Sequence, residues 1–149
     1  ELANNKRIYV SHKCTYEKNN NYDYKIFGHS HKQCEFVRDN VKYINPGSVG
    51  IPTDGNIGSQ FVVLEITNNY EKIEQYLVKY DNTELIQELK STSIYNDELK
   101  WGKLLEKELK TGEDIPLKCI DEYEKIREEH HLTEESLEAW NIAVKMVLN

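Results

Sequence analysis

The chain has 149 residues and a formal net charge of −7, because 26 acidic side chains outnumber 19 basic ones. Its length suits a domain of ordinary size, and its acidic balance disfavours nucleic-acid binding, which needs a basic surface that displaces counterions. No apolar run reaches the roughly 20 residues of a membrane span, and Cys14, Cys34 and Cys119 are too few for a disulfide framework. We therefore expect a cytoplasmic protein that neither contacts membranes nor binds nucleic acid sequence-specifically.

The first half of the chain is predicted to form strands. Short runs rich in β-branched and aromatic residues lie between turn-forming residues, which is typical of strands. These runs cover residues 7–10, 24–27, 41–44 and 60–66. A further run over residues 73–80 follows after only a short turn. We expect the last two runs to pair as an antiparallel hairpin, because strands so close in sequence leave no room for a parallel crossover.

From residue 81 onward the apolar residues recur at the spacing of helices. Asp81 and Glu84 resemble a capping box that begins a first helix, and Gly112 is predicted to end a second. Asp114 is predicted to begin a third helix, and Thr133 to cap the last one. No catalytic pattern accompanies these helices. We expect them to cover a sheet, to pair two subunits in a homo-oligomer, or to cap a cleft.

Histidines stand at the ends of two predicted strands. His12 closes the first strand, and Gly28, His29 and His31 directly follow the second, where Gly28 would permit a bend. Ends of neighbouring strands converge in an α/β sheet, so three imidazoles would gather at one rim. Imidazole binds Zn, Mn, Fe or Ni. On this pattern alone, a chance His-x-His on the surface is the more frequent explanation, and two divalent cations would also need carboxylates.

A turn with a defined conformation follows the third predicted strand. It consists of Asn45, Pro46, Gly47 and Ser48. Pro46 fixes its own φ, Gly47 takes the positive φ of a type II turn, and Asn45 stays extended before proline. Two roles are open for Ser48: donating to a phosphate oxygen, or stabilising the turn, which we favour.

A strand, Gly-His-x-His, a short hairpin and Asn-Pro-Gly-Ser, taken in this order, resemble the C-terminal half of the calcineurin-like metallophosphoesterases, in the small prokaryotic phosphodiesterase branch. The resemblance covers about residues 7–66. It implies an α/β fold, part of an α/β/β/α sandwich of mixed sheets followed by a helical region. Residues 1–80 would be the C-terminal half of the phosphoesterase domain, and residues 81–149 a helical C-terminal extension.

In this family two metal ions activate a bridging hydroxide for attack on phosphorus. The resemblance therefore implies two divalent cations, Mn first among them and Fe, Zn or Ni also compatible. It places His12 and His29 on one metal and His31 on the other. The supporting turn would be formed by Asn45, Gly47 and Ser48.

The family's Asp-x-His, Gly-Asp and Gly-Asn-His motifs do not occur in residues 1–149, and the chain begins at Glu1 without an initiator methionine. We expect the bridging aspartate and the general acid upstream of Glu1, in an N-terminal half that partners this chain. No catalytic residue is then expected within the chain itself. Lys13 stands where the family usually has glycine, and its side chain would crowd the metal edge or meet a substrate phosphate.

The predicted function is hydrolysis of phosphate mono- or diesters, incomplete without the N-terminal half. A second hypothesis is a catalytically inactive scaffold on the same fold, with the helical region as its partner surface. The Gly-His-x-His motif favours the enzyme, because a scaffold has no need for imidazoles at that rim. A third hypothesis is an unrelated strand-and-helix domain.

Overall fold

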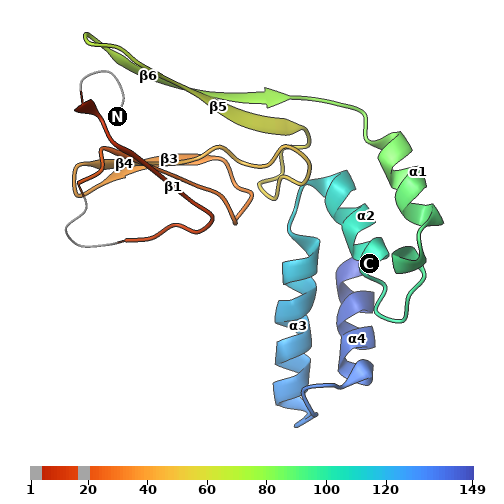
Figure 1. Ribbon diagram of the computed structural model, residues 1–149. Helices are drawn as coiled ribbons and strands as arrows, with labels where there is room; N and C mark the ends of the chain where they lie inside the picture. Colours follow the sequence, from red (N-terminus) through yellow and green to blue (C-terminus); the bar gives the residue numbers. More distant parts are fainter. Residues whose placement is uncertain (1–4, 17–20) are drawn as a thin grey trace. The chain divides into compact units, whose positions relative to one another are not determined.

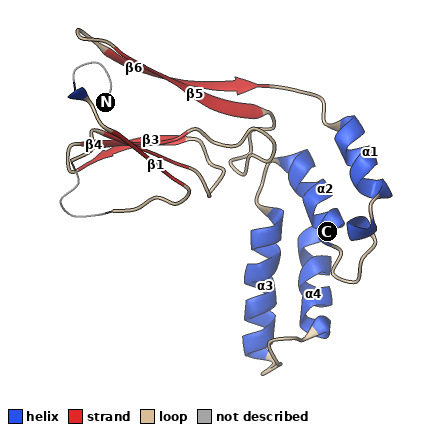
Figure 2. Cartoon of the chain, in the orientation of Figure 1, coloured by secondary structure: helices blue, strands red, loops and turns tan. Residues whose placement is uncertain are grey.

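The structure is a computed structural model that describes residues 5–16 and 21–149. The chain forms two compact units, Glu1–Tyr80 and Asp81–Asn149. Strands make up the first unit and helices the second, as Figures 1 and 2 show. The fold class is mixed α/β, as predicted. Within the described ranges, no helix is long and apolar enough to cross a membrane.

The first unit contains a mixed four-stranded sheet with the strand order β1-β2-β4-β3. β1 (Ile8–Ser11), β2 (Tyr24–Phe27) and β4 (Val41–Asn45) run parallel, while β3 (Cys34–Arg38) pairs antiparallel with β4. The two central strands, β2 and β4, are the most buried. Because β1 and β2 are parallel neighbours, both strands end at the same edge of the sheet.

A small aromatic cluster lies on one face of this sheet. Phe27, Val41 and Tyr43 are buried in it, and Phe36 packs against them from β3. The rings of Phe36 and Tyr43 stack with centroids 4.9 Å apart. These two residues are direct partners across β3 and β4, so the stacked rings support the hairpin that carries them.

The second sheet is the antiparallel hairpin of β5 (Ser59–Ile66) and β6 (Glu71–Val78). The predicted hairpin is thus confirmed, although β6 begins and ends two residues before the predicted run. The Lys42 ammonium donates to Glu71 Oε2 at 2.8 Å and so ties the hairpin to β4. This contact is the first cause that lowers the pKa of the Glu71 carboxyl to about 2.

The second unit is built from α1 (Thr83–Ser91), α2 (Trp101–Thr111), α3 (Ile115–Glu129) and α4 (Leu137–Leu148). A short 3-10 helix, η2 (Ser93–Tyr95), lies between α1 and α2. This unit has a core of its own, to which α2, α3 and α4 contribute. The buried core residues are Leu104, Ile115, Cys119, Ile126, Ala139, Trp140, Ala143 and Val144.

Two of the predicted helix boundaries are confirmed. Gly112 follows the last residue of α2 with φ of 68°, a left-handed conformation that glycine adopts without strain. Asp114 caps α3, because its side chain accepts a hydrogen bond of 3.0 Å from the backbone N–H of Leu117. Both residues satisfy backbone groups that a helix end leaves unpaired.

Two predicted helix starts are wrong, the first by one residue and the second by three. The cap position of α1 is Asn82, and Asp81 instead accepts from the backbone N–H of Thr83 at 2.9 Å, in a turn before the helix. α4 is capped by Ser136 and not by Thr133, whose carbonyl accepts from the Ser136 N–H at 3.2 Å. In both places several capping residue types follow one another, and the turn geometry selects among them.

Candidate metal centre

The sheet topology brings the first two histidines to one edge. Ser11 and Phe27 are the last residues of β1 and β2 and are paired in register. His12 follows immediately, and its carbonyl accepts a hydrogen bond of 3.1 Å from the Gly28 N–H. This bond continues the strand pairing by one step, so that His12 and His29 emerge side by side.

The imidazoles of His12 and His29 face each other. His12 Nε2 and His29 Nδ1 are 3.1 Å apart, and the rings meet nearly edge to face at 72°. Two nitrogens that bind one metal at about 2.1 Å each, at an angle between about 90° and 110°, lie roughly 3.0–3.4 Å apart. The observed spacing is that of a hydrogen bond between the two rings, and it also fits a pair of imidazoles on a single cation. Both side chains are exposed to solvent.

The bend after β2 differs from the prediction. Gly28 was expected to provide it, but Gly28 does not have a positive φ; His29 and His31 do, at 68° and 54°. A left-handed conformation costs a residue with a side chain about 1–2 kcal/mol. Such strain persists only where the surroundings enforce it, and it occurs often at functional sites. The contacts that enforce it here are therefore part of the site.

His31 makes a contact apart from the other two histidines. Its Nδ1 lies 2.9 Å from the carbonyl oxygen of Ile51. A carbonyl only accepts, so Nδ1 carries the hydrogen and the neutral ring presents the lone pair of Nε2. This is the arrangement by which outer contacts prepare a histidine for metal binding. Within residues 5–16 and 21–149, no three His, Cys, Asp or Glu side chains gather into a metal-binding group.

Asn45 joins the histidine bend to the proline turn. It is fully buried at 0% exposure. Its Nδ2 donates to the Gly28 carbonyl at 3.1 Å and to Ser30 Oγ at 3.0 Å. Its Oδ1 accepts from the Gly47 N–H at 2.9 Å. Both ends of the amide are thus engaged, and each holds one of the two turns.

The proline turn has the predicted positive φ at Gly47, which is 85°. A Cβ at this position would lie 2.1 Å from Gln60 Oε1, so a side chain there would displace Gln60. Ser48 Oγ accepts from the Ile51 N–H at 3.0 Å. The contacts of Ser48 therefore correspond to the turn-stabilising role.

Two buried polar residues of this region were missed by the sequence analysis. Thr53 Oγ1 donates to the Ser30 carbonyl at 2.7 Å, and Gln60 Nε2 donates to the Asp54 carboxylate at 2.8 Å. A glutamine at the start of an apolar run is a weak signal that could have indicated Gln60. No local signal indicates Thr53, because its partner lies far away in the sequence.

Lys13, Cys14 and Cys34 lie near the histidines in the sequence and make different contacts. Lys13 is exposed, and its carbonyl accepts a hydrogen bond from Ser11 Oγ at 2.7 Å. Cys14 and Cys34 are half-buried and pack against the cluster that contains Phe27. Burial raises the pKa of the Cys34 thiol. This thiol therefore stays protonated at neutral pH, which disfavours metal binding.

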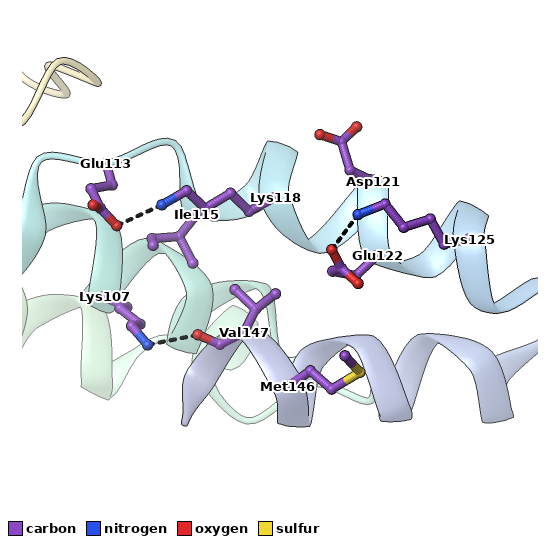
Figure 3. A pocket seen from close by; sticks show the side chains of 9 residues that line it. All are labelled: Lys107, Glu113, Ile115, Lys118, Asp121, Glu122, Lys125, Met146 and Val147. Carbon is purple, nitrogen blue, oxygen red and sulfur yellow. Dashed lines mark hydrogen bonds and ion pairs between the residues drawn. The ribbon is translucent and has the colours of Figure 1, made fainter.

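A cavity of about 410 Å³ lies in the helical unit, and no histidine is among the residues that line it (Figure 3). Phosphate recognition would require an excess of positive charge, but the three lysines that line this cavity are matched by three carboxylates, those of Glu113, Asp121 and Glu122. The contacts are those of Lys107 with the Val147 carbonyl, Lys118 with Glu113 and Lys125 with Glu122. The cavity therefore does not have the chemistry of a phosphate site.

Residues 3–69 match the sequence model of the calcineurin-like phosphoesterase superfamily domain. The match includes His12, His29, His31 and the proline turn. No curated protein matches the chain. The resemblance inferred from the motifs is therefore confirmed at the level of the superfamily over these residues, while the prokaryotic phosphodiesterase branch and the restriction to the C-terminal half of the domain stay predictions.

Proposed function

We propose that this chain is part of a metal-dependent phosphoesterase that hydrolyses phosphate mono- or diesters. The observation that carries the proposal is the facing pair of imidazole nitrogens, 3.1 Å apart, at the shared edge of two parallel strands. The superfamily match over residues 3–69 supports it, because the pair lies inside the matched segment.

Three histidines have distinct roles in this proposal. His12 and His29 bind one divalent cation through their facing nitrogens, and His31 binds a second through Nε2. The cations supply a metal-activated hydroxide and neutralise charge on the phosphate. Mn is the first expectation, and Fe, Zn and Ni are compatible with the same ligands. The chain's own task is to hold three neutral imidazoles in fixed directions.

Three imidazoles do not complete the coordination of two divalent cations, which also need oxygen ligands. In this proposal the remaining ligands are carboxylates and an amide. We propose that they come from a segment outside residues 1–149, which supplies the bridging aspartate and the general acid. Residues 1–149 alone then show no turnover of phosphate esters. The site becomes active only when that segment is supplied.

Metal binding can be tested on residues 1–149 by isothermal titration with Mn²⁺, Co²⁺ and Zn²⁺, the last two serving as strongly imidazole-binding probes. We expect the substitution His29→Gln to weaken binding at least tenfold, because one of two facing ligands is lost. His130→Gln is the matched control: His130 follows α3 in the helical unit, so its loss should leave the affinity unchanged. Absence of binding to the unmodified chain would contradict the proposal.

An inactive interaction scaffold is the alternative function. Exposed apolar side chains on α3 and α4 favour it, namely Leu117, Ile120, Ile142 and Met146. The same titration separates the two functions, because a scaffold has no reason to bind divalent cations at the histidines. Hydrolysis of bis(p-nitrophenyl) phosphate after addition of an N-terminal segment would decide for the enzyme.

A further inference from the structure

A short segment, residues 51–53, is attached to Ser30 and His31 by three hydrogen bonds. His31 Nδ1 donates to the Ile51 carbonyl at 2.9 Å. The Thr53 N–H donates to the His31 carbonyl at 3.3 Å, and Thr53 Oγ1 donates to the Ser30 carbonyl at 2.7 Å. The ring and the backbone of His31 are thus both held by this segment.

The segment itself is fixed in place. The Ile51 N–H donates to Ser48 Oγ at 3.0 Å, which anchors one end to the proline turn. Pro52 is buried and its ring fixes φ, so the middle of the segment has little freedom. Thr53 forms the other end and is only 8% exposed. Because the segment is rigid, a displacement of Thr53 would also displace the carbonyl of Ile51.

The attachment of residues 51–53 holds a strained backbone in the histidine bend. His29 and His31 both have left-handed backbone conformations, at φ of 68° and 54°. Without tethers the bend would relax toward conformations that side chains prefer. Asn45 holds the side of the bend that includes Gly28. Thr53 is the residue that holds the other side, next to His31.

We infer that Thr53 is a positioning residue, whose hydroxyl keeps His31 Nδ1 on the Ile51 carbonyl and thereby presents the Nε2 lone pair to the second cation. The claim that a second cation binds at His31 rests on the proposed function. The tautomer of the ring does not, because the hydrogen bond to one ring nitrogen sets which nitrogen carries the proton. Loss of such an outer contact typically weakens metal binding 10- to 100-fold.

The first test is the tautomer of His31 in the metal-free chain, read from long-range ¹H–¹⁵N spectra of the histidine rings. We expect His31 to carry its proton on Nδ1 in the unmodified chain and in Thr53→Ser, which keeps the hydroxyl. Thr53→Val removes the hydroxyl at nearly constant volume and should give a mixture of tautomers. Thr111→Val is the matched control, since Thr111 Oγ1 also donates to a backbone carbonyl, that of Lys107, at 2.9 Å.

The second test is a Co²⁺ titration in which paramagnetic broadening of the His31 ring signals reports binding at that ring. Thr53→Val should need at least tenfold more Co²⁺ than the unmodified chain, and Thr53→Ser should stay within about threefold of it. If no Co²⁺ binds to the unmodified chain, the proposed function fails, and the tautomer alone then decides the role of Thr53.

Three results would overturn the inference. One is a His31 ring protonated on Nε2 in the unmodified chain. Another is a folded Thr53→Val chain whose tautomer and Co²⁺ affinity equal those of the unmodified chain. The third does not depend on a variant that folds: the Thr53 N–H of the unmodified chain should be protected from hydrogen exchange by the His31 carbonyl, and rapid exchange would show that the attachment does not form.

Discussion

Asn45 is the buried amide on which the arrangement of the histidine bend depends. Its amide nitrogen donates to two groups of the bend, the Gly28 carbonyl and Ser30 Oγ, and its oxygen accepts from Gly47. Aspartate has the same shape but no donor when ionised. The change Asn45→Asp would therefore place a carboxylate oxygen against the Gly28 carbonyl in a site without solvent.

We expect Asn45→Asp to lower the free energy of unfolding of the strand unit by about 2–4 kcal/mol at pH 7. The Gly28 carbonyl would lose its donor, and the buried side chain at position 45 would gain a negative charge. The loss should be smaller below pH 4, where the carboxyl takes up a proton. Far-UV circular dichroism during urea unfolding measures it. Asn40→Asp, in the exposed turn after β3, is the matched control and should change stability by less than about 0.5 kcal/mol.

Gln60 and Thr53 show where sequence reasoning about the site ends. His12 and His29 could be predicted to meet because one rule, the convergence of neighbouring strand ends, applies to both. The contact of Thr53 with Ser30 follows no such rule, since it depends on the path of a loop between distant residues. The strain at His29 was also not predictable, because the adjacent Gly28 was the obvious candidate for the bend.

Elements with a strong local pattern were predicted well. β2 begins and ends at the predicted residues, and the C-terminal end of α2 and the start of α3 follow from Gly112 and Asp114. β3 was not found from its own pattern, since it is an exposed edge strand. A signal was present in Asp39 and Asn40, which have the positive φ values, 52° and 63°, of a tight hairpin turn.

Helix α2 carries two buried carboxyl groups with opposite environments. Glu106 accepts hydrogen bonds from Lys110 and Tyr95 and lies 3.0 Å from the Lys90 ammonium, which together lower its pKa to about 2. Glu108 is only 5% exposed, and burial, followed by repulsion from Asp114, raises its pKa to about 7. Opposite effects on stability are therefore expected within one helix.

Ionised Glu108 destabilises the folded helical unit, because its pKa is raised there. The folded helical unit binds this proton more tightly than the unfolded chain, whose carboxyl has the ordinary value of 4.5. The unfavourable contribution is absent below pH 4.5, grows between pH 4.5 and 7, and is complete above pH 7. We expect Glu108→Gln to stabilise the unit by about 2 kcal/mol at pH 8 and by little at pH 4.5.

Urea unfolding at the two pH values, followed by tryptophan fluorescence, measures this effect, because both tryptophans, Trp101 and Trp140, lie in the helical unit. Glu106→Gln is the matched control and should destabilise the unit at pH 8, since it removes a carboxylate that its partners hold ionised. A Glu108→Gln variant that is less stable than the unmodified chain at pH 8 would contradict the assignment.

The two units differ in how completely each provides its own core. The helical unit buries eight residues in one cluster, including Leu104, Trp140 and Val144. The strand unit buries three in its aromatic cluster, and Tyr24 and Ile44 outside that cluster. In the described part of the chain, β1 also has a neighbour on one side only. Parallel sheets are normally covered and rarely stable with so little burial.

We therefore expect residues 81–149 to be more stable than residues 1–80 when each is produced alone. The helical fragment should show helical circular dichroism and cooperative urea unfolding, with a free energy of about 2–5 kcal/mol, the range that a core of this size supplies. The strand fragment should unfold at a lower urea concentration than the helical fragment, because its smaller core offsets less of the entropy of ordering the chain. A strand fragment as stable as the helical fragment would show that the sheet needs no further strand, and would weaken the proposal that a separate segment completes the phosphoesterase site.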